Sequence, residues 1–529
     1  MHRQIKFIGL SLLMFINALS FGQNNTLSVV EIEQNAIHFS WQDLEPSMVE
    51  LEYGLSPKLE LGLVEGLSLT NLEDASFYYV KAKSKEPQSR QESEIQLFST
   101  ASNSSGKITV YFNQPVNNSA STLADALYRP AFEDSLIAYI NRTQYTLDVC
   151  NYNTGSLPIV NAINAAKTRG VVVRYIAADN TLTNNDELAN LSSTIPMIQR
   201  PSDGEVMHNK FLIIDVADSL RSNLITGSVN HTNNSCHQDY NNLVIIQDQA
   251  LALAYELEFE EMWGSAGNTP NLTNAKFGNA KTDNTPHSFS IGGVPVQLYF
   301  SPSDGTTAQI ESAILSANTD MQFALLTFIN NDLGDAVETI HNSGVDVKGI
   351  IENIYYFGSE YNGLKNAGVD VHSHFSKPHF LHHKYGIVDA NNSLSDPLVI
   401  TGSHNWTNSA ENDYDENTLI IHDAVIANMY YEEFMARYAQ ITNTTRIEGQ
   451  EQTQVRVFPN PIVNTLNIES KSPIKDIKII NSLGQSVYIA TSLNHKNLEI
   501  DLSFLSSGLF YLAIELDKTT IIHKINTLK

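Results

Sequence analysis

The amino-acid sequence predicts an α/β protein built from two pseudo-symmetric α/β halves, with a small β-sandwich domain at each end. A stretch at 208–215 recurs at 382–389, and each copy has a His, a Lys two positions later and an Asp seven positions after the His. Each copy is followed by Gly-Ser-x-Asn, at 227–230 and at 402–405. Helical and strand patterns alternate in the same order around both copies, which is typical of an α/β layer structure.

The totals describe a globular protein with room for several domains. The chain has 529 residues, of which 42% are hydrophobic and 17% are charged, and this excludes a disordered chain. The net charge of −26 argues against a surface built to bind polyanions. Only Cys150 and Cys236 are present, so a disulfide scaffold or a zinc ribbon is excluded. A disulfide between these two and a pair of buried thiols remain equally open.

The N-terminal region predicts export followed by an accessory domain. Residues 1–23 place Arg3 and Lys6 before a short apolar run and small residues, the pattern of a secretory signal peptide. The run is too short for a stable membrane span. Residues 25–100 hold short alternating strands separated by turn residues, which predict a β-sandwich. Trp41 and Tyr78, the latter as a corner tyrosine, resemble the pattern of a fibronectin type III domain, and we expect a spacer or binding accessory.

The two halves are predicted at 108–264 and 294–442, joined by a linker rich in Asn, Thr and Gly. Each half shows a helix, a strand, a second helix and a second strand before its motif, and a strand and a long helix after it. The first half has these elements at 132–140, 146–150, 157–167, 171–175, 243–246 and 251–263. The second half has them at 310–315, 321–328, 333–341, 345–351, 419–421 and 424–438.

The last segment, 452–529, changes composition and predicts a small β-sandwich. Its Phe-Pro-Asn-Pro at 458–461, Leu-Gly-Gln at 483–485 and Ser-Gly-Leu-Phe at 507–510 resemble the C-terminal sorting domain of type IX secretion substrates. Phe510 stands where that pattern usually has Tyr. The resemblance implies type IX secretion machinery as a partner and a mature protein on the cell surface or in the medium. An adhesive or carbohydrate-binding module is the alternative.

Strand geometry sorts the motif residues into two groups. Residues two apart on a strand share a face, so each motif presents its His and Lys together. The same rule pairs Ser with Asn in each Gly-Ser-x-Asn motif. These candidate phosphate-binding residues are Ser228, Asn230, Ser403 and Asn405. Asp215 and Asp389 lie an odd number of positions from the His, so we expect them to hold structure rather than touch substrate.

The order His-x-Lys-x4-Asp followed by Gly-Ser-x-Asn resembles the signature of the phospholipase D superfamily. The resemblance implies that both motifs line one active site and that a monomer is complete, because one chain carries both. It also implies a phosphohistidine intermediate, with His208 favoured as nucleophile. Superfamily members carry a carboxylate thirteen positions after the motif Ser. This position is Glu416 in the second half but Asn241 in the first, so we expect Glu416 to orient one His while the first half uses Asn241 or Asp239.

The candidate catalytic residues form a set that needs no cofactor. Two histidines can supply a nucleophile and an acid near neutral pH, and two ammonium groups can hold the phosphate oxygens. These residues are His208, Lys210, His382, Lys384 and Glu416. No metal-binding or P-loop motif accompanies them. His383 should face the other side of its strand, and Trp406 could form either an apolar wall of the site or part of the core.

Three functions are compatible with this pattern. The first is a secreted phosphodiesterase that hydrolyses glycerophospholipids as a phospholipase D, and the second is an extracellular endonuclease of the same superfamily. The third is a non-catalytic surface binding protein built on the same α/β core. The acidic total counts against DNA as substrate. The preferred head group or nucleotide, and whether the mature form is anchored or released, are left open.

Overall fold

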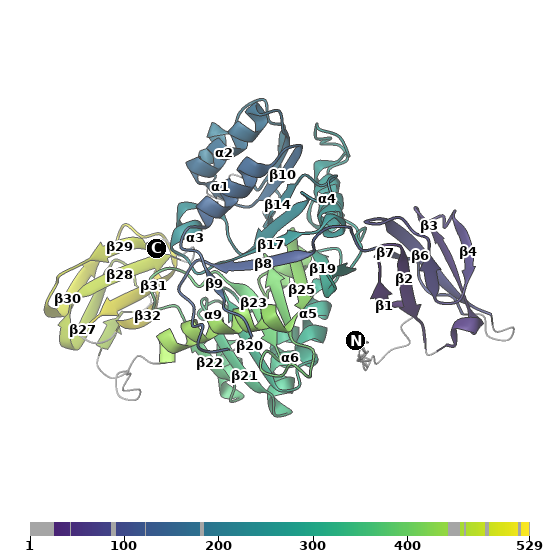
Figure 1. Ribbon diagram of the computed structural model, residues 1–529. Helices are drawn as coiled ribbons and strands as arrows, with labels where there is room; N and C mark the ends of the chain where they lie inside the picture. The colour runs from purple at the N-terminus through teal and green to yellow at the C-terminus, as the bar shows by residue number, and fades with distance from the viewer. Residues whose placement is uncertain are drawn as a thin grey trace, which may run out of the picture. The chain divides into compact units, whose positions relative to one another are not determined.

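The computed structural model describes residues 26–42, 44–85, 91–121, 123–179, 185–442, 455–459, 462–481, 486–516 and 520–527 (Figure 1). The predicted signal peptide lies outside these residues, as do Asn460, Pro461 and the Leu-Gly-Gln of the predicted sorting pattern. The chain forms two compact units, Met1–Ile441 and Thr442–Lys529. None of the helices in the described ranges is long and apolar enough to cross a membrane.

The N-terminal domain is a sandwich of a three-stranded and a four-stranded sheet. The first sheet has the order β1-β2-β5 and the second the order β4-β3-β6-β7. Their strands are β1 (Ser28–Ile32), β2 (Ala36–Ser40), β3 (Val49–Gly54), β4 (Gly62–Glu65), β5 (Ser68–Thr70), β6 (Phe77–Ser84) and β7 (Gln96–Ser99). Trp41 and Tyr78 are buried in the core between the sheets, and the Tyr78 hydroxyl accepts a hydrogen bond from the Glu73 N–H at 3.0 Å. A kinship with fibronectin type III domains stays a prediction.

The first central half is an eight-stranded mixed sheet with the order β13-β12-β10-β14-β15-β17-β8-β9. Its strands are β8 (Lys107–Phe112), β9 (Leu127–Tyr128), β10 (Thr146–Asn151), β12 (Val172–Ala177), β13 (Met197–Gln199), β14 (Lys210–Ile214), β15 (Asn223–Gly227) and β17 (Asn242–Gln247). Beside it lie a two-stranded pair, β11 (Thr154–Gly155) and β16 (His231–Thr232), and the helices α1 (Phe132–Arg142), α2 (Leu157–Thr168), α3 (Asn233–His237) and α4 (Gln249–Trp263).

The second half repeats this order except at one edge strand, which comes before its neighbour in the chain rather than after it. Its eight-stranded sheet runs β22-β21-β20-β23-β24-β25-β19-β18. The strands are β18 (Ser288–Ile291), β19 (Val294–Ser301), β20 (Asp320–Leu325), β21 (Asp346–Ile351), β22 (Asp370–Ser373), β23 (Lys384–Val388), β24 (Leu398–Gly402) and β25 (Glu416–His422). The helices are α5 (Thr306–Leu315), α6 (Asn331–Asn342), α7 (Tyr361–Asn366), α8 (Asn408–Asn412) and α9 (Ala424–Thr442). The prediction of two pseudo-symmetric α/β halves is confirmed.

The halves are joined by one continuous apolar core. The outer face of each sheet packs its own helices, α1 and α2 in the first half and α5 and α6 in the second. The inner faces share a cluster with α4 and α9 (Figure 1). Phe211 of β14 and Tyr385 of β23 occupy matching places in this cluster, against Tyr255 and Tyr430. Because both sheets bury their inner faces against the same helices, the two motifs are fixed relative to each other.

The structure amends the prediction of a linker between the halves, and it decides the state of the two cysteines. The stretch between the halves is more than a linker, because it ends in β18 and contributes a fully buried Lys281. Cys150 and Cys236 are both buried free thiols. The Cys150 sulfur lies 3.3 Å from the Met207 sulfur, while the Cys236 thiol faces the Asn230 carbonyl.

The C-terminal unit is a separate sandwich of a three-stranded sheet, β26-β27-β30, and a four-stranded sheet, β29-β28-β31-β32. Its strands are β26 (Val455–Phe458), β27 (Thr465–Ile474), β28 (Asp476–Asn481), β29 (Ser486–Ala490), β30 (His495–Asp501), β31 (Gly508–Glu515) and β32 (Thr520–Thr527). Alternate residues such as Ile477 and Ile479 fill the core between the sheets, as the period of two requires. Phe510 is buried in that core.

Candidate active site

The two motif histidines sit at the joint between the halves, each just before a central strand. The His208 N–H donates to the Asp415 carbonyl at 2.9 Å, and the His382 N–H donates to the Tyr240 carbonyl at 2.9 Å. Both bonds cross from one half to the other and occupy equivalent places in the two halves. The backbone of each half therefore fixes the motif histidine of the other.

The imidazole partners also cross the joint, and they differ in charge. The His208 Nδ1–H donates to the Glu416 carboxylate, with distances of 2.8 and 2.9 Å to its two oxygens. The His382 Nδ1–H faces the Asn241 amide oxygen at 2.9 Å and the Ser228 carbonyl at 3.0 Å. Asp239, the other first-half candidate, instead accepts from the Phe380 N–H. With Nδ1 engaged in both rings, Nε2 is the nitrogen left for chemistry.

Each motif lysine returns to the backbone of its own histidine. Lys210 Nζ donates to the His208 carbonyl at 2.5 Å, and Lys384 Nζ donates to the His382 carbonyl at 2.8 Å. Lys210 Nζ also lies 5.0 Å from the centre of the Tyr152 ring, which packs edge-on against His208. Each His–Lys pair is thus one unit, and Tyr152 forms an aromatic wall beside the first pair.

Burial governs the ionisation of this cluster. Burial lowers the pKa of His208 to about 4 against the opposing charge of Glu416, and it lowers the pKa of Lys210 to about 7. Burial and then the neighbouring cations hold the pKa values of His382 and Lys384 well below their usual ranges. Burial raises the pKa of Glu416, but the charges of His208 and Lys210 outweigh it and keep that pKa low.

The lowered pKa values of the two histidines and two lysines suit this cluster to an anionic ligand. Without a ligand, burial favours the neutral forms of both imidazoles and of both lysines, because four basic groups share one buried space with the carboxylates of Glu416 and Asp239. A bound anion would add negative charge to this cluster, and its arrival would raise the proton affinity of the bases. The cluster is built to receive an anion.

The Ser and Asn of the Gly-Ser-x-Asn motifs lie beside the histidines but have unequal freedom. The Ser228 hydroxyl donates to Asn241 at 2.8 Å and accepts from the Asn242 N–H at 3.0 Å. The Ser403 hydroxyl accepts from the Asn417 N–H at 3.0 Å. The buried side-chain oxygens of Asn230 and Asn405 find no hydrogen-bond partner within the described residues. Within the described residues these two oxygens, beside the histidines, are buried acceptors that await a donor.

The motif glycines are required by close packing. Gly227 and Gly402 have φ values of 135° and 139°, and a Cβ would lie 2.4 Å from the Asn242 carbonyl oxygen or 2.2 Å from that of Asn417. A side chain at either position would push apart the neighbouring strands that position the motif residues.

Asp215 and Asp389 lie at the far ends of β14 and β23. The Asp215 carboxylate accepts from the N–H groups of Gln144, Tyr145 and Thr146. The Asp389 carboxylate does the same for Asn318, Thr319 and Asp320. These bonds fasten the start of the neighbouring strand, which supports the structural role expected of both residues.

Several residues that sequence reasoning missed hold the joint together. Asn417 Nδ2 donates to the Asn209 side chain at 2.7 Å, and Asn242 Nδ2 donates to Thr401 at 3.0 Å. Asp415 lies between Arg200 and the buried Lys281, with distances of 2.9 and 3.4 Å. Asn242 and Asn417 follow the thirteenth-position residues in the two copies, so alignment of the repeats could have found them.

His383 and Trp406 are structural. His383 is buried on the inner face and lies 3.1 Å from the Glu433 carboxylate, which also holds Arg437. Trp406 is fully buried and packs edge-on against Phe328, so it belongs to the core. The groups of His and carboxylates able to hold a metal in the described chain, Glu31 with Glu33 and His38 and Asp283 with His287 and Asp304, include no motif residue.

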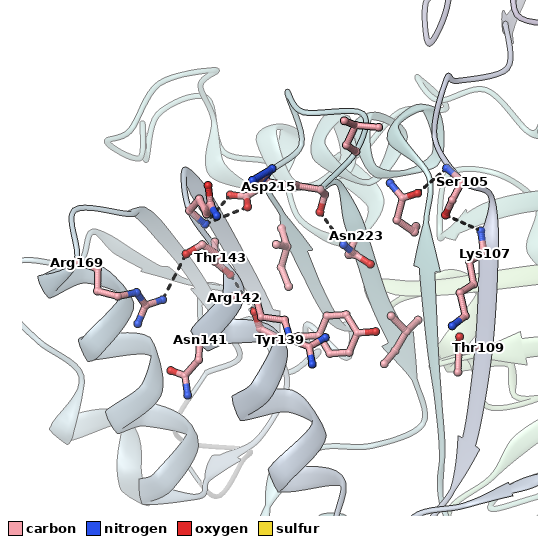
Figure 2. Close-up of a pocket in the computed structure, with 16 residues that line it drawn as sticks. Ser105, Lys107, Thr109, Tyr139, Asn141, Arg142, Thr143, Arg169, Asp215 and Asn223 are labelled. Atoms are coloured by element: carbon pink, nitrogen blue, oxygen red, sulfur yellow. Dashed lines mark hydrogen bonds between the residues drawn. The ribbon is translucent and has the colours of Figure 1, made fainter.

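A pocket of about 660 Å³ lies elsewhere in the first half (Figure 2). It is lined by Asp215, Asn223, Tyr139 and Arg142 among others, at the end of β14 opposite Lys210. Arg169 at its edge is occupied by the carbonyls of Ile140 and Thr143, which close α1. The pocket is therefore separate from the histidine cluster, and the chemistry described above does not use it.

Comparison with known proteins agrees with this geometry. Residues 136–263 and 310–438 each match the family described as cardiolipin synthase, PLD-like domain. The two central halves are phospholipase D-like domains. Residues 456–527 match the secretion system C-terminal sorting domain, so the terminal sandwich is a sorting domain. The resemblances predicted from the repeated motif and from the C-terminal pattern are thereby confirmed.

The central domains also resemble individual proteins. The mitochondrial cardiolipin hydrolases of Mus musculus and Homo sapiens are 34% and 32% identical, over 134 and 143 residues. These matches cover 25% and 27% of this chain, and 58% and 54% of the relatives, so the chain spans just over half their length. The solved phospholipase D family member Nuc from Salmonella typhimurium is 29% identical, covering 28% of this chain and 95% of Nuc, with a TM-score of 0.25.

Proposed function

We propose that the protein is an exported, metal-independent phosphodiesterase that works through a phosphohistidine, acting as a phospholipase D on glycerophospholipids. The observation that carries the proposal is the crossed pairing at the joint, where His208 contacts a carboxylate and His382 contacts a neutral amide. Two otherwise equivalent histidines are thereby given different strengths as bases. This difference supports a division between a nucleophile and an acid.

In the first step, Nε2 of neutral His208 attacks phosphorus and forms an N–P bond. The P–O bond to the head group breaks, and His382 gives its Nε2 proton to the leaving oxygen. The phosphorylated His208 ring carries positive charge, which the Glu416 carboxylate at 2.8 Å stabilises. Lys210 and Lys384 bind the non-bridging oxygens as they gain charge.

In the second step, water replaces the head group. His382, now neutral, takes a proton from the water as the oxygen attacks phosphorus and the N–P bond breaks. The product is a phosphomonoester, and both histidines return to their starting states. Asn241 suits His382 to this double duty, because an amide acceptor orients the ring without stabilising its charged form as a carboxylate would.

Two further observations support a phospholipid as the substrate and export as the fate of the chain. The curated relatives are named for the hydrolysis of cardiolipin, a phospholipid. The net charge of −26 disfavours a long polyanion. The sorting domain supports type IX export to the cell surface or medium, and both motifs in one chain support a monomer.

The test is a paired assay of the purified mature chain in EDTA. One arm contains vesicles of phosphatidylcholine and phosphatidylethanolamine, and the other contains plasmid and single-stranded DNA. We expect release of free head group, and no release by the Lys210→Ala/Lys384→Ala protein. Cleavage of DNA alone would point to an endonuclease, and a folded protein silent in both arms would point to a surface binding protein.

Replacement of Glu416 by Gln is expected to lower kcat about 100-fold, with a smaller effect on KM, because an amide cannot balance the charge of the phosphorylated ring. The charge of Glu416 raises the pKa of His208. Without it that pKa falls further, so the acid limb of the kcat/KM profile should move to lower pH in Glu416→Gln.

The matched control is Asn241→Asp, which adds a carboxylate beside His382. It should raise the pKa of His382 and move the alkaline limb of the profile to higher pH. A pH–rate profile of the three proteins checks both shifts, and a Glu416→Gln enzyme with wild-type kcat would contradict the assigned role.

A further inference from the structure

The loop that follows β21 exposes aromatic side chains beside the candidate active site. Tyr355 and Tyr356 are each 43% exposed, and the Phe357 side chain is fully exposed. Phe380, two residues before His382, is 48% exposed. We refer to Tyr355, Tyr356, Phe357 and Phe380 as the aromatic crest. A cluster of large apolar side chains left in water marks an interaction surface.

The crest lies at the catalytic end of the second sheet. β20 and β21 both end where β23 begins, since Leu325 pairs with Lys384 on one side and with Ile351 on the other. The Leu326 N–H donates to the His383 carbonyl at 2.8 Å, and the Asn353 N–H donates to the Leu326 carbonyl at 2.9 Å. The loop therefore starts two strands away from the His382 motif, on its side of the domain.

Hydrogen bonds hold the crest in its exposed position. The Ser359 N–H donates to the Tyr356 carbonyl at 3.0 Å and closes a turn with Phe357 and Gly358 at its centre. Gly358 has a φ of 80°, as the third position of a type II turn requires. The turn therefore fixes the backbone at Phe357, and the Phe357 side chain points into water.

The two parts of the crest are tied to each other and to His382. The buried Glu352 carboxylate accepts from His374 Nδ1 at 2.8 Å and from the Leu381 N–H at 2.9 Å. Tyr355 packs edge-on against Phe375, which follows His374 in the chain. Glu352 begins the aromatic loop and Leu381 precedes His382, so movement of the crest would be felt at the motif.

We propose that the aromatic crest inserts into the surface of a zwitterionic phospholipid bilayer and places the histidine cluster against the head groups. This deepens the proposed phosphodiesterase function and rests on it for the substrate. Tyr suits the boundary between head groups and acyl chains, where its apolar ring and its polar hydroxyl are both satisfied, and Phe suits the apolar side of that boundary. A bilayer also holds the proposed substrate, because long-chain phospholipids do not dissolve in water.

Charge selects the zwitterionic surface. The tip at 353–359 contains no charged residue, and the whole chain carries −26. An anionic bilayer is bound through clusters of Lys and Arg, which this tip lacks. Single-stranded nucleic acid also stacks on exposed aromatic rings, but such sites add a cationic groove that follows the backbone. The nearby Lys377 ammonium donates to the Gln440 carbonyl at 2.8 Å.

The test measures binding separately from hydrolysis. Full mature protein carrying His208→Ala is floated with phosphatidylcholine vesicles, with and without Phe357→Ser. We expect Phe357→Ser to lower vesicle partitioning about tenfold, since one buried Phe side chain contributes at least that factor. The control is Tyr145→Ser, which removes a 56% exposed aromatic ring next to β10, at the opposite end of the strands, and should leave partitioning unchanged.

A second measurement uses protein in which His208 is intact, with and without Phe357→Ser. The substrate is short-chain phosphatidylcholine below its critical micelle concentration. Phe357→Ser should turn over this dissolved substrate within about twofold of wild type, because the crest acts only at an interface. Vesicle partitioning that Phe357→Ser leaves intact would overturn the proposal, as would an equal loss on dissolved and vesicle substrates. A Phe357→Ser defect confined to single-stranded DNA would also overturn it. Phe357-dependent vesicle binding without hydrolysis in any arm would keep the docking surface and remove the phosphodiesterase.

Discussion

His208→Ala is expected to lower kcat by about 10⁵-fold or more, because it removes the atom proposed to form the covalent bond to phosphorus. His382→Ala should lose the same overall turnover, since the first step is slowed without an acid and the second step is blocked without a base, so the phosphoenzyme that forms accumulates. The two variants separate when substrate labelled in its phosphate is mixed with enzyme and quenched. His382→Ala should retain labelled phosphate on the protein, and His208→Ala should retain none.

The contrast depends on the partners of the two rings. The Glu416 carboxylate beside His208 stabilises a positively charged, phosphorylated imidazole, and the Asn241 amide beside His382 does not. A substrate with a good leaving group, such as a p-nitrophenyl ester, should restore most of the first step to His382→Ala but not to His208→Ala. Label trapped on His208→Ala and absent from His382→Ala would reverse the assignment.

The repeated motif carried most of the fold prediction. His, Lys, Ser and Asn at fixed spacing in two copies located the strands at the centre of each sheet, and the parity rule separated the histidines from Asp215 and Asp389. In the structure each His lies just before its strand and each Asp just after it, so the length of the strand separates the two groups. The parity rule also predicted that His383 faces the side of the strand opposite His382, and in the structure His383 lies on the inner face, next to Glu433.

The sequence could not show which half supplies each partner. Glu416 lies close in sequence to the second motif but contacts the histidine of the first, because the two sheets face each other across a pseudo-twofold joint. The same joint makes Lys281 a partner of Asp415. Exposure was equally hidden: Tyr-Tyr-Phe after a buried strand has the composition of more strand, and only the turn at Gly358 shows that Phe357 points into water.

Lys210→Met and Lys384→Met are each expected to lower kcat/KM about 10³-fold while making the protein more stable. Activity falls because an ammonium group no longer balances the charge that develops on the phosphate oxygens. Stability rises because burial disfavours both charged forms, as the lowered pKa values of Lys210 and Lys384 indicate. We expect a gain of roughly 1–2 kcal/mol per site near pH 7, seen as a rise in Tm.

The sign of the pH dependence follows from the same pKa values. The pKa of Lys210 is about 7 in the folded protein and near 10.5 when unfolded, so protonation favours unfolding throughout this window. The stabilisation by Lys210→Met should be largest at pH 7 and shrink as pH rises toward 10. Lys281→Met is the matched control, because Lys281 is also buried but lies 2.5 Å from Glu258 and 3.4 Å from Asp415. Its removal leaves buried Glu258 without its cation and leaves Asp415 with Arg200 alone, and should destabilise the fold by about 3–5 kcal/mol. If all three substitutions lowered Tm alike, the motif lysines would be structural cations like Lys281. That result would contradict the claim that burial of the motif lysines destabilises the protein without a bound anion.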